Sequence, residues 1–276
     1  MGYMRALKVS LALTGCLALL PATATTASAA TLDLTGGTTN AACVAAGGTL
    51  IVVGTTNYCN FAGALWSTSD SQSTGTGVID SFVRISGNTD EVSGMNTSDR
   101  PLNQDENSSP TFTHDITEGI VPIVNIGGTN YYEFLLDINQ TNEDPFLTLE
   151  GLELCHSVAG NQEIAANEND CAGTDFYSLD AGGDNEVELD YSDNSGSGSG
   201  DLFVYIPVPA GGIPDANFLY LWSQFGPSPN NNNDGFEEWA IRTATPISPT
   251  PDAGSTLSLL GLAMLGAGYL RRRRLI

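Results

Sequence analysis

Acidic and amide residues crowd one stretch of the chain, and their oxygen atoms are of the kind that bind calcium. The set is Asp180, Asp184, Asn185, Asp190, Asp193, Asn194 and Asp201. Ca²⁺ takes about six to eight oxygen ligands from carboxylates, amides and loop carbonyls. The spacing does not match an EF-hand loop. Asp and Asn also bond to nearby backbone in ordinary turns. The stretch predicts turns first and a calcium cofactor as the alternative.

Four of the five cysteines, those that follow Ala29, fall in two equally spaced pairs. Cys43 and Cys59 are sixteen positions apart, and so are Cys155 and Cys171. An oxidising compartment permits disulfides, and four cysteines allow three pairings. Local closure, Cys43 to Cys59 and Cys155 to Cys171, is the preferred interpretation. Each loop of that length stabilises by about 3 kcal/mol in the chain-entropy estimate. Zinc is disfavoured because CxxC spacing is absent and only His114 and His156 are available.

No arrangement of residues predicts catalysis. Glycoside hydrolysis needs two carboxylates, but no pair stands out among 32 acidic residues. Neither His114 nor His156 lies in a recognisable catalytic setting, and a G-x-S-x-G motif is absent. The chain is therefore expected to be non-enzymatic, with a secreted hydrolase as the weaker alternative.

Aromatic residues give a further candidate site. The set is Trp66, Tyr131, Tyr132, Tyr220, Trp222 and Trp239. In a strand, Tyr220 and Trp222 point to one face, where they would form a platform that stacks on sugars. Packing in the core is the favoured interpretation, and a carbohydrate-binding module is the alternative.

These residues must be positioned by short strands, because no long helical pattern is present between the two ends. Val121 to Ile126 and Tyr131 to Ile138 flank Gly127-Gly128-Thr129, which indicates a hairpin. Glu186 to Tyr191 alternates with period two, so one face is expected to be buried. The other expected strands are Thr49–Val53 (as a buried strand), Val78–Ile85, Phe146–Leu149, Leu152–Leu154, Leu202–Ile206, Phe218–Trp222 and Trp239–Ile241.

Turn residues separate these strands, and the pattern favours an all-β fold, an antiparallel β-sandwich of jelly-roll type, over residues 30–243. Asn194 to Gly200 and Asn230 to Asn233 are expected to be loops. Residues 244–252, with three prolines, predict a stiff spacer.

The N-terminus predicts export. Arg5 and Lys8 precede an apolar run from Val9 to Leu20, and Ala27-Ser28-Ala29 has the small-x-small pattern of a cleavage site. Residues 1–29 therefore predict a signal peptide. Leu13-Thr14-Gly15-Cys16 is similar to a lipoprotein lipobox, but the apolar run continues past the cysteine, so lipidation is the minor alternative.

The C-terminus predicts a membrane anchor. Residues 253–270 are apolar and would span roughly 27 Å as a helix, about the thickness of a bilayer core. Arg271, Arg272, Arg273 and Arg274 follow directly. By the positive-inside rule these arginines stay in the cytoplasm and the rest of the chain lies outside.

This tail resembles the PEP-CTERM class of sorting signals, in its VPDSG-type variant, over residues 251–274. The motif is Pro251-Asp252-Ala253-Gly254-Ser255-Thr256, with Thr250 and Ala253 in place of the usual valine and serine. The resemblance implies processing by an exosortase, a membrane transpeptidase-like enzyme, in bacteria that make exopolysaccharide and biofilm. Blocks such as Asp105–Pro110, Glu133–Gln140 and Asn233–Trp239 resemble uncharacterised exported proteins with such tails.

Charge narrows the set of partners. Three arginines and all 32 acidic residues lie between Ala30 and Asp252, which gives this segment a formal charge of −29. A surface so acidic repels nucleic-acid phosphates and anionic lipid heads. The sequence therefore predicts an exported cell-surface or matrix protein of structural function that does not bind nucleic acid, with exopolysaccharide as a candidate partner.

Overall fold

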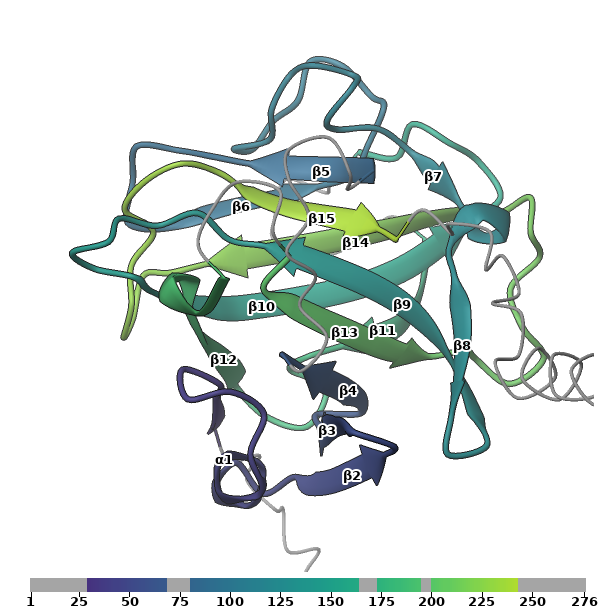
Figure 1. Ribbon diagram of the computed structural model, residues 1–276. Helices are drawn as coiled ribbons and strands as arrows, with labels where there is room; N and C mark the ends of the chain where they lie inside the picture. Colours follow the sequence, from purple (N-terminus) through teal and green to yellow (C-terminus); the bar gives the residue numbers. More distant parts are fainter. Residues whose placement is uncertain (1–28, 69–79, 164–172, 195–199, 243–276) are drawn as a thin grey trace, which may run out of the picture.

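The computed structural model describes residues 29–68, 80–163, 173–194 and 200–242, and these residues form two β-sheets that face each other (Figure 1). Sheet A comprises β1 (Ala30–Asp33), β6 (Val92–Met95), β7 (Ile116–Thr117), β10 (Phe146–Ser157), β11 (Thr174–Ser178), β12 (Asn185–Asp190) and β14 (Phe218–Phe225). Sheet B comprises β2 (Thr49–Val53), β3 (Thr56–Phe61), β4 (Ala64–Ser67), β5 (Asp80–Ile85), β8 (Ile123–Ile126), β9 (Thr129–Asp137), β13 (Leu202–Pro207) and β15 (Glu237–Ile241). The predicted all-β class is confirmed.

Almost all strand pairs are antiparallel. Sheet A runs in the order β1-β12-β10-β14-β6, with β11 beside β10 and β7 beside β14. Sheet B runs β2-β3-β4-β13-β9-β15-β5, with β8 beside β9. Among the pairs of the described strands, only β1 and β12 run parallel. Helical structure in the described ranges is confined to α1 (Asn40–Ala45) and two short 3₁₀ turns, Glu118–Ile120 and Tyr191–Asn194.

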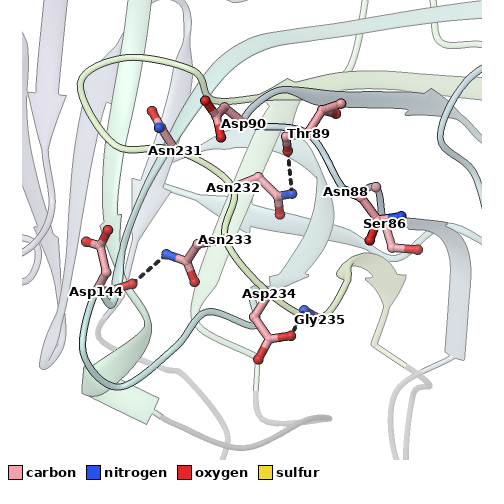
Figure 2. A pocket seen from close by; sticks show the side chains of 11 residues that line it. Ser86, Asn88, Thr89, Asp90, Asp144, Asn231, Asn232, Asn233, Asp234 and Gly235 are labelled. Carbon is pink, nitrogen blue, oxygen red and sulfur yellow. Dashed lines mark hydrogen bonds between the residues drawn. The ribbon is translucent and has the colours of Figure 1, made fainter.

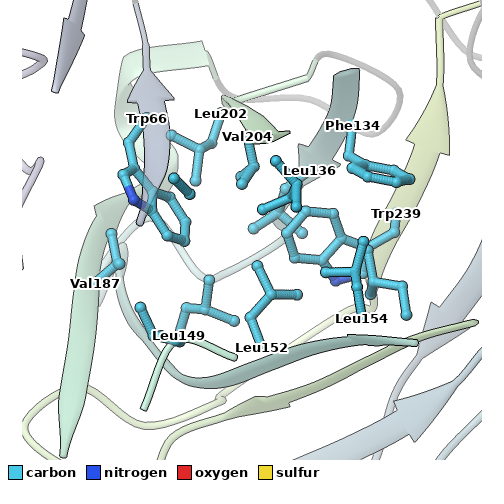
Figure 3. Packing of buried hydrophobic residues seen from close by; sticks show 14 of the residues in the cluster. Trp66, Phe134, Leu136, Leu149, Leu152, Leu154, Val187, Leu202, Val204 and Trp239 are labelled. Carbon is cyan, nitrogen blue, oxygen red and sulfur yellow. The ribbon is translucent and has the colours of Figure 1, made fainter. Parts of the chain in front are cut away.

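One hydrophobic cluster fills the space between the sheets (Figure 3). Trp66 and Trp239 extend from sheet B and are fully buried, opposite Leu149 and Leu152 of β10. Each buried indole has a partner for its N–H group, as such rings require. Trp239 Nε1 donates to Ser223 Oγ in sheet A at 2.9 Å, so this bond joins the two sheets.

Two local predictions, one alternating strand and one hairpin, are confirmed. In β12, Val187 and Leu189 are buried while Glu186 and Glu188 are partly exposed. The hairpin predicted around Gly127-Gly128 is formed by β8 and β9, with both glycines at positive φ. Period-two patterning therefore identified the buried face of β12, and the glycines identified the turn of the hairpin.

Two strand predictions are corrected. Phe146–Leu149 and Leu152–Leu154 belong to the single strand β10, because an irregularity at Leu149/Gly151 shifts the register against β14 without ending the strand. Thr49–Val53 is a strand as expected, but it lies at the edge of sheet B and is not buried. Val52 is 58% exposed.

A disulfide attaches the N-terminal segment to sheet B. Cys43 in α1 is bonded to Cys59 in β3, which confirms the predicted local pairing. Helix α1 begins after Thr39, whose Oγ1 accepts a hydrogen bond from Ala42 N, a standard N-cap. Cys155 is also disulfide-bonded. Cys171 lies outside the described residues.

Both predicted targeting segments lie outside the described residues. These are the signal peptide up to residue 28 and the tail with its spacer, sorting motif, apolar span and arginine cluster. Across the ranges that the structure describes, no helix has both the length and the apolar character needed to cross a bilayer.

Candidate functional site

A polar pocket of about 690 Å³ lies at one end of the two sheets (Figure 2). We call it the loop pocket. Its lining consists of Ser86, Gly87, Asn88, Thr89, Asp90, Asp144, Asn231, Asn232, Asn233, Asp234 and Gly235. Its volume falls in the usual range for small-molecule sites, about 300 to 1,000 Å³.

Three connections between the sheets form this pocket. Residues 86–90 lead from β5 in sheet B to β6 in sheet A, and Asp144 lies between β9 and β10. Residues 231–235 lead back from β14 to β15. Each connection passes over the same end of the core. The three loops therefore come together there, although they are far apart in the sequence.

Asn232 holds two of these loops together at the base of the pocket. It is 6% exposed, whereas the other polar side chains of the lining are exposed. Its backbone N donates to Asp90 O at 3.0 Å, and its Nδ2 donates to Thr89 O at 3.0 Å. The β5–β6 loop is therefore fixed against the β14–β15 loop by two hydrogen bonds from one residue.

Asn233 connects the same loop to the β9–β10 connection. Its Nδ2 donates to Asp144 O at 2.7 Å, and its Oδ1 accepts from Thr141 N at 2.8 Å. Its backbone N donates to Oε1 of the buried Gln140 at 3.0 Å. These three bonds fix Asn233 against the β9–β10 connection, so hydrogen bonds within the protein hold this part of the pocket wall in place.

Gly235 allows the wall to turn into β15. Its φ is +68°, and a Cβ at this position would lie 2.5 Å from Asn139 Nδ2. Both the backbone conformation and the lack of space require glycine. The side chains of Asn232 and Asn233 are consequently held on the pocket side of a fixed turn.

The lining is suited to a ligand rich in hydroxyl groups. Asn side chains both donate and accept, carboxylates accept, and Ser and Thr hydroxyls do either, which matches the donors and acceptors of a sugar. The lining residues include three carboxylates and neither a basic nor an aromatic side chain. The resulting negative charge disfavours an anionic ligand.

Three carboxylates outside the pocket lining have raised pKa values. Burial raises the pKa of Glu237 well above its ordinary value, and nearby Asp137 and Glu238 add to the effect. Burial also raises the pKa of Asp201, with Asp137 and Glu237 contributing. On sheet A, burial and then the charge of Glu186 raise the pKa of Glu150 to about 7.

The predicted calcium ligands do not converge on one point. Asp180, Asp184 and Asn185 lie at the start of β12, whereas Asp190, Asp193 and Asp201 lie beyond or near its end. Asn185 and Asp190 are separated by the length of the strand, about 17 Å at the usual rise. Asp180 Oδ1 accepts from Asn185 N at 2.7 Å and Asp190 Oδ1 accepts from Ser192 N at 2.8 Å, which is the turn chemistry favoured above.

The predicted stacking pair, Tyr220 and Trp222, does share one face, but that face is covered. Tyr220 is 0% and Trp222 is 3% exposed. Trp222 lies against Gly151, where a Cβ would come within 2.7 Å of the ring, and its Nε1 donates to Gln104 Oε1 at 3.1 Å. In this structure the two rings pack against the protein and present no open platform to a sugar.

Comparison with known proteins does not identify the chain. No family model, curated protein or solved structure matches it. The assignment of the candidate site therefore rests on the geometry of the pocket alone. Within the described ranges, His, Cys, Asp and Glu side chains form no group of three or more that could hold a metal ion.

The sequence predicts one loop of the pocket wall but not its role as a site. Residues 230–233 were predicted to be a polar loop, and Asn233–Trp239 was one of the blocks in the resemblance. None of the lining residues, 86–90, Asp144 and 231–235, was predicted as a site residue. Their Asn, Asp and Gly content predicts turns, but only the arrangement of the sheets brings the three loops to one place.

Proposed function

We propose that this chain is an exported, non-enzymatic surface or matrix protein whose loop pocket binds a neutral, hydroxyl-rich polymer, with the cell's own exopolysaccharide as the expected ligand. The single observation that carries the binding role is the pocket of about 690 Å³ with its amide and carboxylate lining. Carboxylates, amides and hydroxyls supply the hydrogen bonds that orient a sugar.

The ends of the chain support the location. The proposed signal peptide, residues 1–29, delivers the protein across the inner membrane. The proposed sorting signal, residues 251–274, holds it there as an intermediate through the span 253–270, until an exosortase-type enzyme processes the tail. The confirmed Cys43–Cys59 disulfide is consistent with an oxidising compartment beyond that membrane.

We assign the two sheets to a jelly-roll-like sandwich. The support for this assignment is that the chain passes to the opposite sheet at each step from β12 to β13, β14 and β15. In such folds the connections gather at the ends of the sandwich, where ligand loops can vary without disturbing the core. The loop pocket occupies such an end.

Polysaccharide binding by the full chain tests the proposal. We expect retention on a neutral glucan, and weaker retention on a polyuronate because the pocket is acidic. Replacing both Asn88 and Asn231 with alanine should lower the affinity about tenfold or more, since two exposed amides of the lining are lost. Unchanged affinity of this double variant would remove the pocket from the proposal.

A matched control separates pocket loss from general surface change. Asn142 is exposed in the β9–β10 connection and does not line the pocket, so Asn142→Ala should bind as the unchanged chain does. The non-enzymatic assignment is checked in the same samples by assaying new reducing ends. Turnover that one carboxylate substitution abolishes would favour a secreted hydrolase.

A further inference from the structure

Strand β2 leaves one edge of sheet B open. Its five residues, Thr49–Val53, pair with β3, and within the described strands they have no second neighbour. Val52 and Val53 are 58% and 43% exposed. An open edge of this kind presents a row of unpaired N–H and C=O groups that can pair with another strand.

The edge also lacks the features that usually prevent such pairing. Proteins protect exposed edges with charged side chains, proline or bulges. β2 contains none of these, and its pairing with β3 is regular along its whole length. Val44 of the adjacent helix α1 is a further exposed apolar side chain, at 59%.

This edge lies in a long stretch of the chain that carries no charge. Every residue from Leu34 to Ser69 is uncharged, although the segment between the two termini carries 32 acidic residues and three arginines. Two copies of so anionic a protein repel each other over most of their surfaces. They can approach most closely where neither carries charge, and β2 lies in the middle of that uncharged segment.

We propose that β2 is a self-association edge, through which two copies of the chain pair antiparallel and join their B sheets. A two-fold axis then passes by Ile51, so Ile51 faces its own copy. Leu50 of one copy faces Val52 of the other, and Thr49 faces Val53. Leu50 packs against the main core cluster, so the exposed Val52 is covered by an extension of that core.

The size of the edge sets the expected strength. Five residues bury far less than the roughly 1,600 Å² of a standard interface, so we expect a reversible dimer with a Kd in the micromolar range. The proposal is independent of the loop pocket. That pocket lies beside β5 and β15, at the other side of sheet B from β2 (Figure 1).

Sedimentation velocity of the full chain in mild detergent tests the proposal. We expect a concentration-dependent dimer. Val52→Lys should abolish it, because the lysine of each copy would lie opposite the apolar Leu50 of the other. Val158→Lys is the matched control, since Val158 is 84% exposed at the far end of β10 and should leave the dimer intact. A chain that stays monomeric up to about 1 mM, or a dimer that Val52→Lys preserves, overturns the proposal.

Cross-linking checks the register. In the proposed dimer, a thiol at Ile51→Cys lies next to its own copy, and a short bifunctional thiol reagent should join the two chains. A thiol at Thr49→Cys lies four residues from its own copy, about 13 Å away, and should not be joined by the same reagent. Equal yields from the two variants would contradict the antiparallel pairing about Ile51.

Discussion

Gln140 Nε2 donates a 2.7 Å hydrogen bond to Oε1 of Glu237, although the two residues are 97 positions apart. Both side chains are buried, and Glu237 is fully so. Gln140 also accepts from Asn233 N through its own Oε1. This relay connects the buried carboxylate to the wall of the loop pocket.

Gln140→Ala should therefore weaken both the fold and the pocket. The substitution leaves Glu237 Oε1 and Asn233 N without their present partners. We expect the free energy of unfolding to fall by about 1 to 3 kcal/mol, measured by urea unfolding. Polysaccharide affinity should fall with it, because the Asn233 loop loses one of its anchors. Gln162→Ala, at a partly exposed surface loop, should change neither quantity by more than a few tenths of a kcal/mol.

Arg84 makes a buried ion pair and two ring contacts whose loss should lower the stability of the fold. Its guanidinium lies between two rings, 3.5 Å from the centroid of Phe112 and 4.0 Å from that of Phe236. Its Nε donates to Glu238 Oε1 at 2.7 Å, and Glu238 is 3% exposed. Arg84→Met would leave this carboxylate buried without its cation, so we expect a loss of about 3 to 5 kcal/mol.

The double variant Arg84→Met with Glu238→Gln isolates the ion pair. Removing both charges should recover much of the lost stability, because the unpaired buried carboxylate is gone. Thermal unfolding of the unchanged chain, Arg84→Met, Glu238→Gln and the double variant measures the interaction energy between the two side chains. Additive losses would show that Arg84 acts through packing against Phe112 and Phe236 alone.

Stability should increase as the solution is acidified from about pH 8 toward about pH 5.5. The pKa of Glu150 is raised to about 7, from 4.5 in the unfolded chain. Burial likewise raises the pKa values of Glu106, Asp201 and Glu237. In this window the folded chain holds protons that the unfolded chain has released, so the free energy of unfolding falls as the pH rises.

Melting temperatures at the two ends of that pH range check this prediction. Glu150→Gln should raise the melting temperature at the higher pH and reduce its dependence on pH. Glu143→Gln is the control, because Glu143 is an exposed carboxylate in the β9–β10 connection. If the unchanged chain were more stable at the higher pH, the raised pKa values would not govern its stability.

Trp222 is expected to be a packing residue. Trp222→Ala should cost about 3 to 5 kcal/mol, the usual range for a buried tryptophan. Gly151→Ala should also destabilise, since its new Cβ would lie 2.7 Å from the ring of Trp222. Trp222→Phe, which keeps most of the apolar contact, should stay folded and bind polysaccharide like the unchanged chain. Lost binding by folded Trp222→Phe would restore the stacking hypothesis.

Local patterns predicted much of the fold. Alternation in Glu186–Tyr191 and the glycine turn at Gly127-Gly128 identified β12 and the β8–β9 hairpin with boundaries close to those observed. These features depend on residues near one another in sequence, where side-chain period and turn chemistry decide the outcome.

Strands with weak patterns were missed. β6, Val-Ser-Gly-Met, and β11, Thr-Asp-Phe-Tyr-Ser, are short and mix polar with apolar residues. Each is stabilised by pairing with a long neighbour, β14 or β10. Nor could the pattern of Tyr220-Leu221-Trp222 show which face would be covered, because the partner Gln104 lies more than a hundred residues away.

The order of sheet B separates two surfaces of different chemistry. The uncharged β2 edge and the polar pocket beside β5 lie on opposite margins of one sheet. A pair of chains joined at β2 would carry a loop pocket at each distal end. Such a bivalent dimer would bind two polymer chains at once or one polymer chain at two places. Its avidity would exceed the affinity of either pocket alone.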